Sequence, residues 1–173
     1  MDRAHGILTR NGWRPNRPLG NTENDRLQLI IEVASIADSG AQPPQLFRDC
    51  ARSIVRHLHL AAARVCLMDE AGQLVEVGAD VQAAGLAEAA PPSFDDEDLR
   101  RLRRDRAPRV WVDYGPGWVA SVPVVASGRI VGVLAIRSEE LPSDLDLQAL
   151  TVVANIVAPE MQRARAGGRS AEE

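Results

Sequence analysis

The side chains best suited to ligand binding lie close together in the second half of the sequence. Trp111, Tyr114 and Trp118 fall within eight residues of one another, although aromatic residues make up only 3% of the chain. Tryptophan and tyrosine offer a flat apolar surface with one polar group, which suits a small organic ligand. Arg109 and Ser121 flank this cluster and could bind the polar or anionic end of such a ligand. The same aromatic residues could instead close the edge of a sheet, and the sequence favours neither interpretation.

The cysteines and histidines carry weaker signals. Cys50 and Cys66 both lie in apolar runs, so we expect buried thiols in a reducing compartment rather than a disulfide framework. The functional interpretation of Cys66 is a redox-sensing or pocket-lining residue. His57 and His59 are two residues apart in a predicted helix and point to different sides of it. Histidine is favoured near a helix C-terminus by the helix dipole, which accounts for both residues without a metal ion. No metal site and no catalytic residue is predicted.

A dense pattern of charge occupies residues 95–106, with the sequence D-D-E-D-L-R-R-L-R-R-D-R. Its acidic residues come first and its basic residues last, an order that complements the dipole of a helix. Asp96 and Arg100, like Glu97 and Arg101, are four residues apart and can form ion pairs. The pattern is typical of a solvated helix face. The alternative is an arginine cluster that binds an anion, for which Arg109 is the better candidate.

Composition excludes several classes of protein. A chain of 173 residues with 45% hydrophobic residues suits one globular domain. A net charge of -4 argues against direct binding to nucleic acid. All 20 basic residues are arginine, which points to a GC-rich bacterial genome rather than to chemistry. No apolar run is long enough for a signal peptide or a membrane span, so a cytoplasmic protein is predicted.

Hydrophobic periodicity predicts the elements that must position these residues. Residues 1–23 are predicted to be a mobile arm, residues 24–165 the folded domain, and residues 166–173 a disordered tail. Residues 79–92 are rich in alanine and fit a short helix or a lid-like loop. The predicted helices cover residues 24–39, 43–60, 93–107 and 143 onward, and the predicted strands cover residues 63–68, 74–78, 109–113, 118–126 and 130–137.

Three local signals mark where helices begin. Pro43 opens the second helix, because proline is tolerated in a first helical turn. Ser93 with Asp96 resembles a capping box at the start of the third helix. Ser143 with Asp146 has the same spacing at the start of the last helix.

The hairpin at residues 118–137 is apolar on both faces, which predicts a place at the centre of a sheet. Strict alternation predicts that Ile130, Leu134 and Ile136 share one face with Gly132, and that the opposite face carries Val131, Val133 and Ala135. We expect helices to cover one face of this hairpin and a pocket to lie over the other.

Four segments, in this order, resemble the GAF domain family. They are A-A-A-R-V-C-L-M-D-E-A-G-Q-L, R-A-P-R-V-W-V-D, S-V-P-V…G-R-I-V-G-V-L-A-I and L-P-S-D-L-D-L-Q-A-L-T-V-V-A-N. The resemblance covers residues 25–165 and implies an α+β fold with a central antiparallel sheet of about five to six strands. It further implies that the N- and C-terminal helices cover one face of the sheet, and that a ligand pocket with short helices lies on the other. The strand, turn and strand around Tyr114 would form the mouth of this pocket.

The sequence lacks the motifs of the better-defined members of that family. Neither cysteine has an adjacent histidine, as bilin attachment usually requires, and the chain has no lysine for the Asn-Lys pair of cyclic-nucleotide-binding members. No cofactor is therefore predicted. Pro159 is expected to kink or end the last helix near Ala158.

The resemblance implies a small-molecule-sensing regulatory domain in signal transduction. We expect a homodimer formed through the helices around Leu29–Ile36 and Leu147–Met161, with the signal passing to a separate output protein. One alternative is a ligand-free module for protein interaction or dimerisation. Another is a thiol-dependent reductase of the same fold, which would need Cys50 or Cys66.

Overall fold

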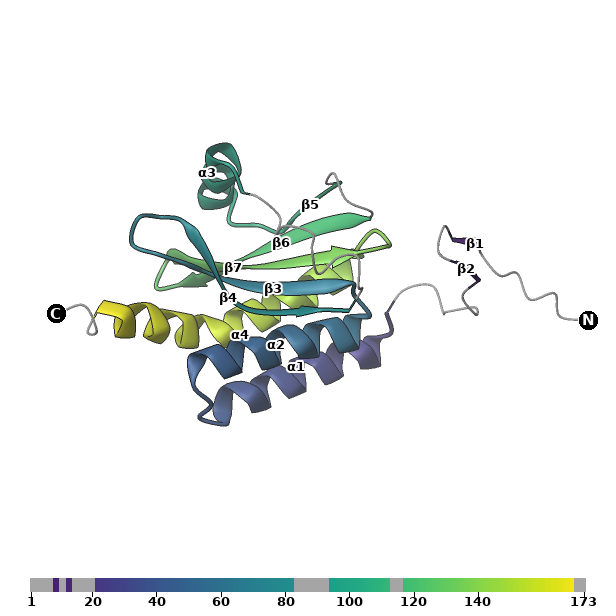
Figure 1. Cartoon of the computed structure of the whole chain (residues 1–173), viewed down its shortest axis with the longest axis horizontal. Coiled ribbons are helices and arrows are strands. Elements are labelled where there is room, and N and C mark those ends of the chain that lie inside the picture. The colour runs from purple at the N-terminus through teal and green to yellow at the C-terminus, as the bar shows by residue number, and fades with distance from the viewer. Residues whose placement is uncertain (1–7, 10–11, 14–20, 83–93, 113–116, 170–173) are drawn as a thin grey trace, which may run out of the picture.

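An antiparallel sheet lies at the centre of the computed structural model, which describes residues 8–9, 12–13, 21–82, 94–112 and 117–169. Its five strands follow the order β4–β3–β7–β6–β5 (Figure 1). They are β3 (Ala62–Met68), β4 (Leu74–Val81), β5 (Arg109–Val112), β6 (Trp118–Ala126) and β7 (Arg129–Ser138). The short strands β1 (Leu8–Thr9) and β2 (Gly12–Trp13) pair with each other inside the predicted arm.

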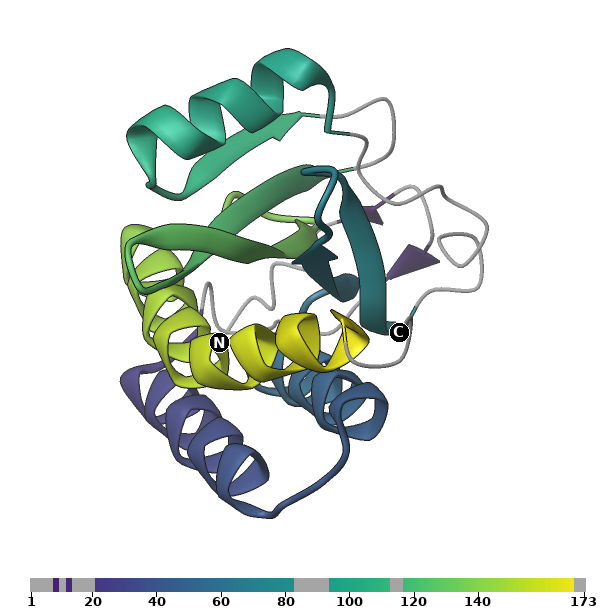
Figure 2. The same ribbon diagram turned by 90° about the vertical axis from the view of Figure 1, so that its left-hand side faces the viewer.

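Helices cover the sheet unequally on its two faces. α1 (Glu23–Asp38), α2 (Pro43–Leu58) and α4 (Asp144–Arg169) lie together on one face, and α3 (Asp96–Asp105) lies on the opposite face (Figures 1 and 2). We call the face with α3 the outer face. The predicted fold class, α+β with the terminal helices on one side of an antiparallel sheet, is confirmed.

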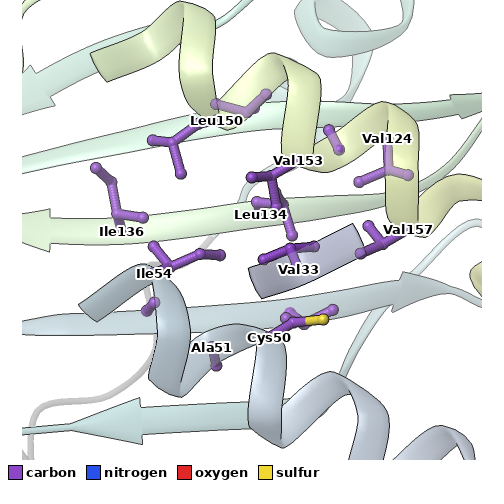
Figure 3. Close-up of a cluster of buried hydrophobic side chains, with 14 of the residues drawn as sticks. Val33, Cys50, Ala51, Ile54, Val124, Leu134, Ile136, Leu150, Val153 and Val157 are labelled. Carbon is purple, nitrogen blue, oxygen red and sulfur yellow. The ribbon is translucent and has the colours of Figure 1, made fainter. Parts of the chain in front are cut away.

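The main core lies between the sheet and the three helices α1, α2 and α4. Figure 3 shows that side chains from all three helices meet the central strands. The labelled members are Val33, Cys50, Ala51, Ile54, Val124, Leu134, Ile136, Leu150, Val153 and Val157, all of which are buried. This layer fixes the sheet from one side.

Side-chain caps explain where three of the four helices begin. Thr22 and Asp25 form a capping box at the start of α1, and the Asp146 backbone N–H donates to Ser143 Oγ at 3.1 Å at the start of α4, as predicted. The predicted cap of α3 is wrong by two residues, because Asp95, paired with Asp98, is the N-cap. Ser93 itself lies outside the described residues.

The turn of the β6–β7 hairpin falls at the predicted Ser127-Gly128 pair, where both residues have positive φ. The predicted faces of β7 are partly wrong. Val124 pairs with Gly132 and Val125 with Ile130, so Val131 is the extra residue of a β-bulge. The bulge breaks the alternation.

The two clusters of buried side chains show the effect of this bulge. Val131 joins Leu134 and Ile136 in the core under the helices, whereas Ile130 and Val133 join a second cluster on the outer face. Ile130 therefore lies on the face opposite to the predicted one.

The last helix differs from the prediction in its length. α4 continues through Pro159 to Arg169, four residues past the predicted domain end at Arg165. Proline removes a hydrogen bond to the residue four positions earlier, Asn155. Both Pro159 and Asn155 are exposed, so water can satisfy the carbonyl group, and the helix changes direction along its length instead of ending (Figure 2).

Candidate functional site

The outer face carries polar side chains from β5, β6 and β3 in one row that crosses β7 at an alanine. Arg109 of β5 pairs with Ser121 of β6, which pairs with Ala135 of β7, which pairs with Arg64 of β3. Residues paired in this way lie side by side on the same face of a sheet. Ser121 and Arg109, both predicted as site residues, are therefore neighbours.

A second row lies next to the first. Trp111 pairs with Val119, which pairs with Arg137, which pairs with Ala62. Arg137 is only 6% exposed and Ser121 only 1%, so both polar groups lie in the interior beside apolar neighbours. An aromatic ring, a hydroxyl group and guanidinium groups thus converge on one face.

Contacts with α3 and the segment before it hold the site together at the β5 edge. The Phe94 and Trp111 rings meet edge to face, with centroids 6.0 Å apart. Arg109 Nη1 donates to Asp98 Oδ1 at 3.0 Å, and the guanidinium carbon lies 5.8 Å from the Trp111 ring centroid. Asp98 therefore both caps α3 and fixes Arg109 over Trp111.

Trp118 and Tyr114 do not complete an aromatic cluster in the described part of the chain. Trp118 of β6 pairs with Val112 of β5, which is the residue next to Trp111. Trp118 and Val112 therefore share one face of the sheet, and Trp111 lies on the other. Side chains one residue apart on a strand point to opposite faces, so Trp118 is not on the outer face. Tyr114 lies outside the described residues. The predicted binding role of all these residues stays a prediction.

Both cysteines are buried, on opposite faces of the sheet. Cys50 belongs to α2 and the main core, whereas Cys66 of β3 follows the core residue Val65 and lies on the outer face. Burial raises the pKa of each thiol to about 12. The thiolate is the nucleophile in cysteine chemistry, so neither thiol is activated for it.

The two histidines are separated, as their spacing predicts. His57 contacts Glu32 of α1, whereas His59 is the exposed, left-handed cap residue after α2. Burial raises the pKa of Glu32, but hydrogen bonds from Arg56, His57 and Ser53 outweigh it and lower this pKa to about 2. Glu32 is thus a structural anion that joins α1 to α2. In the described residues, no three His, Cys, Asp or Glu side chains are placed to hold a metal ion.

Two arginines of the outer face, Arg64 and Arg137, are missing from the sequence-based prediction. Both lie in strands that are otherwise apolar, and their place on the face follows from two-residue alternation with Cys66 and Ala135. The alternation that places these two arginines on the outer face could have been found in the sequence. Their proximity to Ser121 depends on the strand order, which alternation alone does not give.

Comparison with solved structures identifies the fold. The GAF domain of a phosphoenolpyruvate-protein phosphotransferase from Coxiella burnetii aligns with a TM-score of 0.67 and 14% identity, over 84% of this chain and 98% of that one. A phycocyanobilin-bound GAF domain from a cyanobacterial phytochrome aligns with a TM-score of 0.66 and 9% identity, over 82% of this chain and 96% of that one. The chain has the fold of a GAF domain, which confirms the resemblance.

An enzyme shares this fold as well. A free methionine-R-sulfoxide reductase from Neisseria meningitidis, solved in complex with its substrate, aligns with a TM-score of 0.66 and 16% identity, over 84% of this chain and 95% of that one. No protein-family model matches the sequence, and neither does any curated protein. In the part of the chain that the structure describes, no helix is long and apolar enough to cross a membrane.

Proposed function

We propose that this chain is a small-molecule-sensing regulatory domain whose ligand binds on the outer face, beside α3 at the β5 edge of the sheet. The observation that carries this proposal is the convergence of Trp111, Arg109 and Ser121 on one face. A planar apolar surface with a few fixed polar groups is the usual composition of a small-molecule site. The ligand that fits is a flat organic molecule with a polar end that can accept hydrogen bonds from Arg109 and Ser121.

The contacts around Arg109 support binding rather than catalysis. Asp98 holds the guanidinium group at 3.0 Å, which orients its remaining N–H groups without leaving a mobile cation. Ser121 has no histidine among its strand partners, which are Arg109 and Ala135. Among the described residues of this face, the arrangement offers recognition groups and does not pair a nucleophile with a base.

Native mass spectrometry with an absorption spectrum of the purified protein is the first test, since a retained ligand would be visible at once. A thermal-shift titration with benzoate and larger aromatic carboxylates is the second. We expect Trp111→Ala to weaken binding about tenfold, or roughly 1.4 kcal/mol. Trp118→Ala is the matched control, because Trp118 does not lie on the outer face. This variant should keep an affinity within about threefold of the wild-type value.

Two outcomes would contradict the ligand proposal. One is equal loss of binding in the Trp111 and Trp118 variants. The other is the lack of any retained or added ligand together with tight binding to another protein, which would favour the ligand-free interaction module.

We propose that the domain transmits its state as a homodimer through α1 and α4, acting on a separate output protein. Leu29 and Val33, within the predicted interface, are fully buried in the chain's own core. The apolar side chains available to a second copy include Leu27 and Ile31 on α1 and Leu145 on α4, each at least half exposed, and Val152 on α4, which is 40% exposed and lies within the predicted interface. A cytoplasmic location, which suits the two free thiols, is part of the same proposal.

The thiol-dependent reductase stays the weaker alternative. It is motivated by the Neisseria meningitidis enzyme, which has the same fold. The two thiols of this chain are buried on opposite sides of the sheet, so they cannot form a disulfide with each other without rearrangement. Methionine sulfoxide reduction that disappears when Cys50 and Cys66 are replaced by serine would revive this alternative.

A further inference from the structure

A cavity of about 760 Å³ lies away from the outer-face site. It is open to solvent on one side and is bounded by the start of α1, the C-terminal half of α2, the end of β4 and the connection from β7 to α4. None of Arg109, Trp111 and Ser121 lines it. Its size falls within the range of about 300–1,000 Å³ that is usual for small-molecule sites.

Part of the wall is apolar. Val55 and Leu58 of α2 and Leu60, which follows its cap, line the cavity together with Leu141 and Pro142 of the β7–α4 connection. Pro142 and the three α2-side residues are buried, whereas Leu141 is 61% exposed. An exposed leucine at a cavity offers apolar area that an occupant could cover, at about 25 cal/mol for each Å² buried.

The charged part of the wall is predominantly acidic. Five carboxylates line the cavity, against two guanidinium groups and one histidine; they are Asp25, Asp80, Glu139, Glu140 and Asp146, with Arg52, Arg56 and His59. The C-terminal end of α2 adds the negative end of a helix dipole. The cavity therefore favours a positive charge.

The two arginines of the wall do little to offset this charge, because each is paired with an acid outside the cavity. Arg56 contacts Glu32, and Arg52 lies 3.5 Å from Asp49. Asp146 already has a partner, since Arg26 Nη1 donates to its Oδ1 at 3.0 Å. Asp25 is also engaged, because its carboxylate accepts from the Thr22 backbone N–H at 2.8 Å.

Asp80 and Glu140 are the strongest candidates for contact with a ligand. Asp80 is half-buried and accepts a hydrogen bond of 2.8 Å from the neutral amide of Gln82, which leaves its charge uncompensated. Within the described ranges, no arginine or histidine forms an ion pair with Asp80 or Glu140. A carboxylate beside apolar walls suits an amidinium, guanidinium or ammonium group on an apolar body.

We propose that this cavity is a second binding site, which takes an organic cation with an apolar body. A metal ion is a poorer fit, because no three metal-ligating side chains in the described residues are suitably grouped. Asp25 belongs to the first turn of α1 and Asp146 to the first turn of α4, so an occupant of the cavity lies next to both helices of the proposed dimer. This site and its ligand do not depend on the outer-face proposal.

Three compounds with one ring and different charges test the proposal by isothermal titration calorimetry on the full chain. Benzamidine is cationic, benzamide is neutral and benzoate is anionic. We expect benzamidine to bind at least about tenfold more tightly than benzamide at this site, which corresponds to roughly 1.4 kcal/mol.

Matched double variants then locate the binding. Asp80→Asn with Glu140→Gln should weaken benzamidine binding about tenfold or more. Asp96→Asn with Glu97→Gln removes the same amount of charge from α3, on the outer face, and should leave benzamidine binding unchanged. Trp111→Ala should also leave it unchanged, which separates this site from the outer-face one.

Three results would overturn the proposal. The first is no measurable heat from benzamidine with the wild-type chain. The second is equal binding of benzamidine and benzamide, because charge would then play no part. The third is a benzamidine affinity that falls with the α3 control as much as with the cavity variant, which would indicate general electrostatic attraction to an acidic protein.

Discussion

Cys66 illustrates how burial decides the chemistry of a single residue. Its position on the outer face, two residues from Arg64, would allow a ligand-lining or redox role. Its side chain is only 6% exposed, and burial raises its pKa to about 12. Apolar flanking residues predicted that burial from the sequence, whereas the separation of Cys66 from Cys50 by the sheet required the three-dimensional structure.

Native thiols should therefore react slowly. At about pH 8, an aromatic disulfide reagent should modify Cys50 and Cys66 on the order of a hundredfold more slowly in the folded chain than in denaturant, because burial raises the pKa of each thiol to about 12. A folded chain whose thiols react at the rate of the denatured chain would contradict this.

The same pKa shifts predict the direction of alkaline destabilisation. The folded pKa of each thiol is raised, so the folded state favours the neutral form. That stabilisation is fully present below pH 9.0 and is lost as the pH rises towards about 12. The double variant Cys50→Ser with Cys66→Ser should therefore show a weaker dependence of the unfolding free energy on pH in that alkaline range. Equilibrium urea unfolding at several pH values measures this.

At the scale of elements, the central hairpin was predicted well and its faces were not. The positions of the Ser127-Gly128 turn and of both strands follow from local sequence. The bulge at Val131 does not, because Ile130 and Val131 are both apolar and the sequence pattern is the same with or without an extra residue. Pro159 was predicted to kink or end the last helix; α4 changes direction and continues to Arg169, because an exposed proline leaves water to satisfy the freed carbonyl group.

Gly132 is the position where this hairpin tolerates no side chain. An added Cβ would lie 2.3 Å from the Cys66 carbonyl oxygen and 2.9 Å from the Met161 side chain of α4. Gly132→Ala should lower the free energy of unfolding by about 2–3 kcal/mol, as expected for overpacking against backbone. Urea unfolding measures this.

Gly167→Ala is the matched control for the Gly132 variant. It adds a Cβ within α4 where no atom lies within 4 Å. It should leave stability unchanged or raise it by up to about 1 kcal/mol. Equal losses in both variants would refute the steric explanation for Gly132.

At the scale of the whole molecule, the layer order was predictable and the cavity was not. Apolar strands and amphipathic helices indicate a sheet covered by helices. The cavity instead draws its walls from α1, α2, β4 and the β7–α4 connection. No local pattern marks residues that are separated by more than a hundred positions, as Asn21 and Asp146 are.

The proposed dimer gives a prediction for the whole molecule. Ile31 is 60% exposed on α1, so Ile31→Arg would place a charge in the interface and should convert the dimer to a monomer. Size-exclusion chromatography with light scattering at tens of micromolar measures this. Val75→Arg is the control, because Val75 is 49% exposed on β4, away from α1 and α4.

A wild-type chain that is monomeric at this concentration would refute the dimer. A dimer that resists Ile31→Arg but dissociates with Val75→Arg would place the interface on the β4 edge of the sheet instead.

The bulge in β7 has a consequence for how relatives of this chain can vary. Because the bulge adds one residue to β7, Val131 packs in the core under α1, α2 and α4, and Ile130 packs in the cluster that includes α3. Exchanging one apolar residue for another there preserves both faces, but deleting one residue moves everything between the turn and the bulge to the wrong side. Evolution along this segment should therefore keep its length more strictly than its residue identities.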